Sequence, residues 1–177
     1  MRGRAATLVG VVVAAAVAWV LVGPAGAVTT GRSTTMQSLE SGVLGQINTI
    51  RRAHGLVALR ISPALDAAAR QHTVEMAKDG YFSHSSANGG TFDRRIGRYY
   101  PANSHYWSVG ENLLWCSPNV DAVSALQMWM NSPEHRANLL MPRWREIGVS
   151  AVHVASAPGT YGGHEVTIIT TDFGVRR

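Results

Sequence analysis

The chain has 177 residues and a formal net charge of +5; 46% of its residues are hydrophobic and 15% are charged. This composition excludes a disordered chain and a collagen-like repeat, and it is typical of a soluble globular domain. Without the arginines at positions 2 and 4, 14 basic residues face 11 acidic ones. So small a surplus does not indicate a nucleic-acid-binding surface, and no nucleic-acid partner is expected.

The N-terminus has the layout of a secretory signal peptide. Two arginines precede an uncharged apolar run over residues 8–22, and small residues follow up to Ala27. This pattern predicts cleavage after Ala27, a flexible leader over residues 28–35 and a single secreted domain over residues 36–177. The alternative is an uncleaved segment that anchors the domain to the outer face of the membrane.

Cysteine usage limits how the fold is stabilised. Cys116 is the single cysteine, so an internal disulfide is excluded although export leads to an oxidising compartment. The cysteine ends the apolar run 113–115, which is typical of a small buried side chain rather than a reactive thiol. The hydrophobic core must therefore stabilise the fold.

Helical patterns occupy the first part of the domain and return before its end. Apolar residues at helical spacing predict a helix over residues 36–54, closed by a glycine. A second helix is predicted over residues 62–80, because Ser-Pro suits a helix start and glycine its end. A third is predicted over about residues 119–130, and a short fourth starts at Ser132-Pro133.

The C-terminal part is rich in β-branched residues. Residues 148–154 and 165–170 predict two strands, and the turn-forming loop 157–163 predicts that they pair antiparallel. A third strand is predicted around residues 111–115. Helices around a small antiparallel sheet, without regular strand-helix alternation, predict the α+β class.

Three polar residues, His84, Glu111 and His135, fall at the boundaries of predicted elements, where side chains reach the rim of a cleft. With Ser132 as N-cap and Pro133 next, His135 lies in the first turn of a short helix. There the helix dipole favours a neutral imidazole, the state that a metal ligand or a general base requires.

The sequence resembles the CAP superfamily, which includes cysteine-rich secretory proteins, insect venom antigens, plant pathogenesis-related proteins and many exported bacterial proteins. The resemblance spans most of residues 36–174 and rests on six motifs in order. The motifs are Asn48-x-x-Arg51 with Gly55-Leu56, Ala77-x-x-Gly80-x-Phe82-Ser83-His84, Gly110-Glu111-Asn112-Leu113, Trp129-x-x-Ser132-Pro133-x-His135-Arg136-x-Asn138-Leu139-Leu140, Glu146-x-Gly148-Val149 and Asp172-Phe173-Gly174.

The resemblance implies a three-layer α-β-α sandwich with a small antiparallel sheet, about four helices and a central cleft. It places the divalent metal ligands of the family at His84, Glu111 and His135, with zinc the expected cation. Animal and plant members carry a further glutamate three residues after the tryptophan that corresponds to Trp129. Here that place is Ser132, as in the shorter bacterial form, so the full ligand set is not carried over.

Three roles for the cleft stay open. The leading expectation is a monomeric extracellular binding module whose partner is a lipid or sterol, or an envelope or host component. The alternative is a metal-dependent hydrolase with Glu111 or His135 as the catalytic group. In the third, Glu111 orients a histidine and the cluster is only a structural latch.

Further residues are expected to line the cleft. Asn112 and Ser132 lie close in the sequence to predicted metal ligands. Aromatic residues of the loop between His84 and Glu111 are expected to line the wall of the cleft and to be partly exposed. The expected lining residues are Ser132, Asn112, Tyr106 and Trp107, and the loop also contains Tyr99 and Tyr100.

Overall fold

The computed structural model describes residues 36–102 and 106–176. The predicted signal segment and leader, residues 1–35, lie outside the described residues. The first described element, α1 (Met36–Ala53), begins at the predicted start of the domain. Among the described residues, no helix is long and apolar enough to cross a bilayer.

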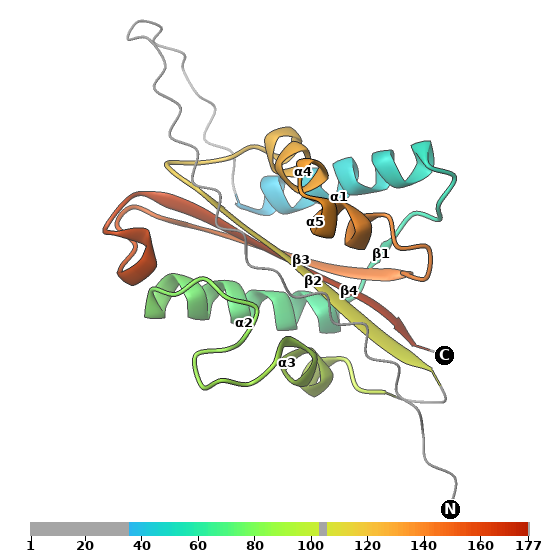
Figure 1. Ribbon diagram of the computed structural model, residues 1–177, viewed down its shortest axis with the longest axis horizontal. Coiled ribbons are helices and arrows are strands. Elements are labelled where there is room, and N and C mark those ends of the chain that lie inside the picture. The colour runs from blue at the N-terminus through green and yellow to red at the C-terminus, as the bar shows by residue number, and fades with distance from the viewer. Residues whose placement is uncertain (1–35, 103–105, 177) are drawn as a thin grey trace, which may run out of the picture.

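The described residues form three layers (Figure 1). On one face of the sheet lie α1, α4 (Ala122–Asn131) and α5 (Pro133–Leu139); on the other lie α2 (Pro63–Asp79) and α3 (Phe92–Tyr99). The sheet has the strand order β1-β3-β4-β2, with β1 (Arg60–Ile61), β3 (Glu146–Val154), β4 (Val166–Arg176) and β2 (Trp107–Cys116). The predicted α+β sandwich is confirmed.

The sheet and the helix count depart from the prediction in two details. The sheet is mixed rather than antiparallel, because the two-residue strand β1 runs parallel to β3. The antiparallel pairing of β3 with β4 is confirmed. The additional helix is α3, a helix of 8 residues with Phe92 and Ile96 as its apolar anchors, too short a pattern to be recognised as periodic.

The central strand β4 separates two packing environments. Its residues Ile169, Phe173 and Val175 belong to the core under α1, α4 and α5, whereas Val166 and Ile168 pack with Met76 of α2. Because side chains alternate along a strand, even-numbered positions of β4 face α2.

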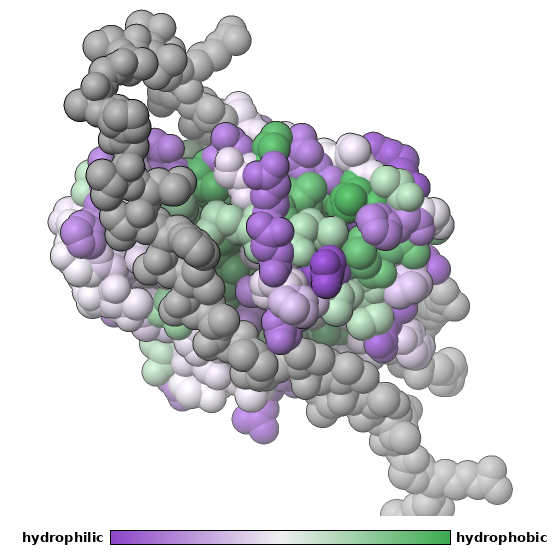
Figure 2. Space-filling view, turned by 45° about the horizontal axis from the view of Figure 1, so that its top comes forward, coloured by the Kyte–Doolittle hydropathy of each residue, from purple (hydrophilic) through white to green (hydrophobic). Residues whose placement is uncertain are grey.

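The outer face on the α1, α4 and α5 side mixes hydrophobic and hydrophilic residues (Figure 2).

The loop after α2 is held from both sides. Gly80 ends α2 with φ +69°, and its carbonyl accepts a hydrogen bond of 2.8 Å from the amide of Thr160. Tyr161 donates from its hydroxyl to the carbonyl of Tyr81 at 2.8 Å. These bonds tie the start of residues 81–84 to the loop between β3 and β4, and so fix where His84 lies.

Partial exposure was expected for the aromatic residues Tyr99, Tyr100, Tyr106 and Trp107, and for Tyr100 this is wrong. Tyr100 is fully buried: its hydroxyl bonds to Glu146, and the guanidinium of Arg176 lies 4.1 Å from the centre of its ring. Tyr99 and Tyr106 are exposed, and Trp107 is half-buried. The short helix α3, which the sequence did not predict, encloses Tyr100.

We predict that Gly148→Ala destabilises the protein by about 3 kcal/mol or more, at the upper end of overpacking effects. A Cβ at position 148 would lie 2.1 Å from the carbonyl carbon of Leu65, and backbone of α2 cannot give way as a flexible side chain can. Chemical denaturation of both proteins measures the difference.

The matched control is Gly45→Ala in the exposed face of α1, where a Cβ meets nothing within 4 Å. It is expected to stabilise the protein by about 0.5–1 kcal/mol, because alanine favours a helix. Equal stability of the two variants would contradict the close packing of β3 on α2.

Candidate functional site

A cavity of about 80 Å³ opens beside β2, between the loop that carries His84 and helix α5. It brings together the three residues predicted from their element boundaries. Of the other predicted lining residues, Asn112 lines it, whereas Ser132, Tyr106 and Trp107 do not. The lining residues are His84, Phe92, Ser108, Val109, Gly110, Glu111, Asn112, Glu134, His135, Ala137, Asn138, Met141, Arg143 and Trp144.

The carboxylate of Glu111 lies behind His84 and not in the open cavity. Its side chain has no exposed surface, while that of His84 is 17% exposed. His84 Nδ1 lies 2.8 Å from Glu111 Oε1, and Arg95 forms an ion pair with Glu111 Oε2. Both carboxylate oxygens are therefore engaged.

The charge state of Glu111 follows from these partners. Burial alone would raise the pKa of Glu111, but the hydrogen bond from His84 and the charge of Arg95 outweigh it, so the pKa is lowered. An ionised carboxylate accepts the Nδ1 proton of His84. In the neutral ring, this leaves the lone pair on Nε2 of His84.

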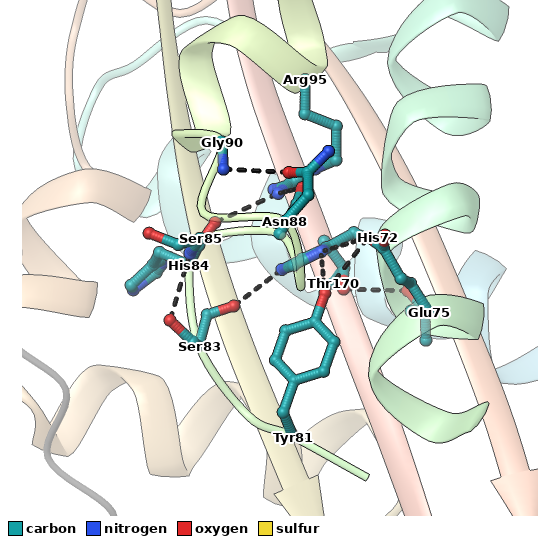
Figure 3. A network of polar contacts seen from close by, with 12 residues as sticks. His72, Glu75, Tyr81, Ser83, His84, Ser85, Asn88, Gly90, Arg95 and Thr170 are labelled. Carbon is teal, nitrogen blue, oxygen red and sulfur yellow. Dashed lines mark hydrogen bonds and ion pairs between the residues drawn. The ribbon is translucent and has the colours of Figure 1, made fainter. Parts of the chain in front are cut away.

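The loop that carries His84 is fixed by two further side chains (Figure 3). The buried ring of His72 in α2 donates from Nε2 to the carbonyl of Ser83 at 2.8 Å. Arg95 of α3 donates from Nη1 to the carbonyl of His84 at 3.1 Å. The imidazole of His84 is thus held from its backbone and from Nδ1.

The second imidazole has the same arrangement. His135 Nδ1 lies 2.8 Å from Ser132 Oγ, whose hydroxyl donates to Glu134 Oε2 at 3.3 Å. Since the serine proton points to Glu134, Nδ1 of His135 is the donor and Nε2 carries the lone pair. Burial, and then the charge of nearby His84, lowers the pKa of His135. The sequence predicted a neutral ring from the helix dipole; burial is the larger cause.

Asparagine side chains fasten α5 to the edge of β2. Asn112 donates from Nδ2 to the carbonyl of His135 at 3.2 Å. Asn138 donates to Asn112 Oδ1 at 2.9 Å and to the carbonyl of Glu111 at 3.2 Å, and it accepts from Trp144 Nε1. These bonds set the position of His135 relative to His84.

Two buried ionisable residues of the site, Arg95 and Asp172, were not assigned a role from the sequence. Arg95 lies in the unpredicted helix α3. Asp172, directly opposite Glu111 in the β2–β4 register, is fully buried, and neither of its oxygens has a hydrogen-bond partner among the described residues. Burial, and then the charge of Glu111, raises the pKa of Asp172 well above its usual range. The available signal was a single acidic residue in a strand rich in β-branched residues.

The predicted three-ligand metal site can be compared with this geometry. Among residues 36–102 and 106–176, no group of three or more His, Cys, Asp or Glu side chains is arranged to hold a metal ion. The reason lies in Glu111, whose oxygens face Arg95 and His84. The two imidazoles are of a type that fits zinc, and the carboxylate is placed as a partner of His84.

The three layers and the histidine-lined cleft define a class of α-β-α sandwich domains with a polar site at the edge of the sheet. Residues 44–164 match the family described as "CAP: Cysteine-rich secretory protein family". The chain belongs to this family, as its sequence motifs predicted.

Bacterial proteins are among its relatives. YkwD of Bacillus subtilis (strain 168) is 31% identical over 129 residues, which is 72% of this chain and 48% of YkwD. The membrane protein YlbC of the same organism is 31% identical over 110 residues, 62% of this chain and 30% of YlbC. The chain thus spans half or less of the length of these two relatives.

Solved structures agree with the fold. An extracellular protein with an SCP domain from Bacillus anthracis str. Ames is 30% identical, with a TM-score of 0.60 over 86% of this chain and 45% of that protein. An outer surface protein from Borrelia burgdorferi, 21% identical, has a TM-score of 0.61 over 76% of this chain and 90% of its own. The latter supports the fold alone.

We predict that removing the charge from each of the two buried acids at pH 7 changes stability by very different amounts. Glu111→Gln leaves the charge of Arg95 without its counter-ion and is expected to cost roughly 3–5 kcal/mol of stability. Asp172→Asn replaces a carboxyl group whose raised pKa favours its neutral form, and it is expected to change stability by less than about 1 kcal/mol. Urea denaturation at pH 7 measures both, and an Asp172→Asn variant as unstable as Glu111→Gln would show that Asp172 is ionised.

We predict that the ring of His135 titrates below pH 6.5, its usual value. A lowered pKa means that the unfolded chain binds the proton first, so this contribution to stability is present above pH 6.5 and is lost as the pH falls below it. Histidine NMR titration, with the resonance assigned from His135→Gln, gives the midpoint. A midpoint at or above 6.5 would contradict the burial of this ring.

Proposed function

We propose that this chain is an extracellular CAP domain that binds its ligand in the cleft through a divalent cation held by His84 and His135. The observation that carries the proposal is the orientation of both rings: each has Nδ1 engaged in a hydrogen bond, which leaves Nε2 as the ring nitrogen available to a cation. Two imidazoles that line one cavity are a donor set that zinc accepts.

The environment of His84 supports this role. A histidine whose Nδ1 donates to a buried carboxylate is fixed in orientation, a common arrangement behind metal-binding histidines. With two protein ligands, the cation would offer its remaining positions to oxygen or nitrogen atoms of the bound ligand. Glu111 then acts on His84 and not on the cation.

The same contacts favour binding over hydrolysis. A general base must reach the proton that it abstracts, and the carboxylate of Glu111 is fully buried with both oxygens engaged. The cavity of about 80 Å³ also suits a small polar group better than a sterol or lipid chain, since pockets for drug-sized ligands measure about 300–1,000 Å³.

The extracellular location rests on two supports. The N-terminal sequence has the layout of a signal peptide. The Bacillus anthracis relative with the SCP domain is described as extracellular. An envelope or host component with an exposed polar group is the partner class that fits a small cleft.

Zinc titration tests the proposal. We expect calorimetry to detect one zinc site in the wild-type protein and thermal stability to rise with zinc, by about 2.7 kcal/mol at 100 times the dissociation constant. His84→Gln and His135→Gln should each weaken binding at least tenfold. The matched control is His153→Gln on β3, whose ring contacts Thr167 and Glu165 away from the cleft.

Two results would overturn the proposal. One is a wild-type melting temperature that zinc leaves unchanged. The other is an equal loss of zinc binding in the His153→Gln control. If the cleft is only a latch, the two cleft variants lower stability while zinc affects neither them nor the wild-type protein.

A further inference from the structure

A second hollow lies on the α2 and α3 side of the sheet, and it shares no residue with the lining of the cleft. It measures about 290 Å³, and we call it the α3 hollow. Its walls come from α2, from the turn that precedes α3 and from α3 itself. The residues that line it are Gln71, Glu75, Ser86, Asn88, Gly89, Gly90, Thr91, Arg94, Arg95 and Arg98.

The charges around the α3 hollow are unbalanced. Arg94 and Arg98 are exposed, lie one helical turn apart, and form no ion pair with a described residue. Glu75 is the one acidic lining residue, and its carboxylate accepts a hydrogen bond from the hydroxyl of Tyr81 at 3.1 Å. Two unpaired guanidinium groups therefore face a hollow with a single, already engaged carboxylate.

Hydrogen-bond donors add to this charge. Thr91, the N-cap of α3, makes no side-chain bond to the helix, so the first-turn amides have no capping acceptor from it. The buried side chain of Arg95 is 2% exposed and lies beside the turn with Asn88 and Gly90 (Figure 3). Its Nε has no hydrogen-bond partner among the described residues. An oxyanion is the ligand type that matches guanidinium groups and helix-start amides.

The surroundings favour an oxyanion that belongs to a larger molecule. A shallower hollow of about 550 Å³ continues along α2 and shares Gln71 and Glu75 with the α3 hollow. It contains the exposed ring of Tyr99, and its two cations, Arg70 and Lys78, are balanced by Asp79 and the shared Glu75. This continuation is therefore close to neutral, and the tyrosine offers a flat surface for the body of a ligand.

We propose that the α3 hollow binds a phosphate- or sulfate-type oxyanion group, with Arg94 and Arg98 as its charged contacts. The forked guanidinium groups can each offer two N–H donors to the oxygens of one anion. This site is independent of the cleft and of the metal proposed there.

NMR titration with inorganic phosphate and with sodium sulfate, at constant ionic strength, tests the proposal. We expect amide shifts that saturate and are confined to residues 86–98, and at least tenfold weaker binding in Arg94→Gln/Arg98→Gln. The control Arg52→Gln/Arg136→Gln removes the same charge from two exposed arginines on the opposite side of the sheet and should bind as the wild-type protein does. The His84→Gln variant should also bind normally, which separates this test from that of the cleft.

Vesicle co-sedimentation identifies the source of the oxyanion. Binding to phosphatidylglycerol–phosphatidylcholine vesicles, but not to pure phosphatidylcholine, that is lost in Arg94→Gln/Arg98→Gln supports a lipid headgroup. Phosphate shifts without vesicle binding support a soluble or polymer-borne oxyanion. The proposal is overturned if no saturable shifts occur at residues 86–98, or if both double variants bind phosphate equally well.

Discussion

The buried carboxylate of Glu111 is the constraint on which the arrangement of the site depends. A charged group without exposed surface must be paired and hydrogen-bonded, and Glu111 draws its partners from separate parts of the chain. Arg95 comes from α3 and His84 from the loop after α2, while β2 supplies Glu111 itself. The same ion pair thus holds α3 against the sheet and fixes the ring that faces the cleft.

Burial of the Glu111–Arg95 ion pair costs free energy, and the state of the neighbouring acid Asp172 affects that cost. Asp172 lies opposite Glu111 on β4. If both carboxylates were ionised, two negative charges would share the single positive charge of Arg95. Burial and the charge of Glu111 raise the pKa of Asp172 well above its usual range, which favours the neutral form of this acid and limits the negative charge beside Arg95. Well-packed apolar residues in place of the Glu111–Arg95 ion pair would stabilise the fold about as much. What the ion pair adds is a defined orientation of His84.

The sequence predicted most of the framework and the three polar residues that meet at the cleft. Helix boundaries at Pro63 and Gly80 were readable because proline and glycine act locally. The prediction did not include Arg95, because α3 has two apolar anchors and an internal glycine. It also started β2 near Glu111, whereas the strand begins at Trp107. Trp107 is therefore committed to packing on α3 and Tyr100, and this long-range pairing with β4 is not encoded in local periodicity.

The cleft and the α3 hollow suit ligands of opposite charge, and the side chain of Arg95 contacts both sites. In the cleft, two imidazole nitrogens offer lone pairs, which suits a cation; in the α3 hollow, guanidinium groups and amides offer protons, which suits an anion. Arg95 donates from Nη1 to Ser86 Oγ in the turn at the hollow, and its Nη2 pairs with Glu111 behind His84. Arg95 thus contributes to the structure of both sites, while Arg94 and Arg98 supply the unpaired charge of the hollow.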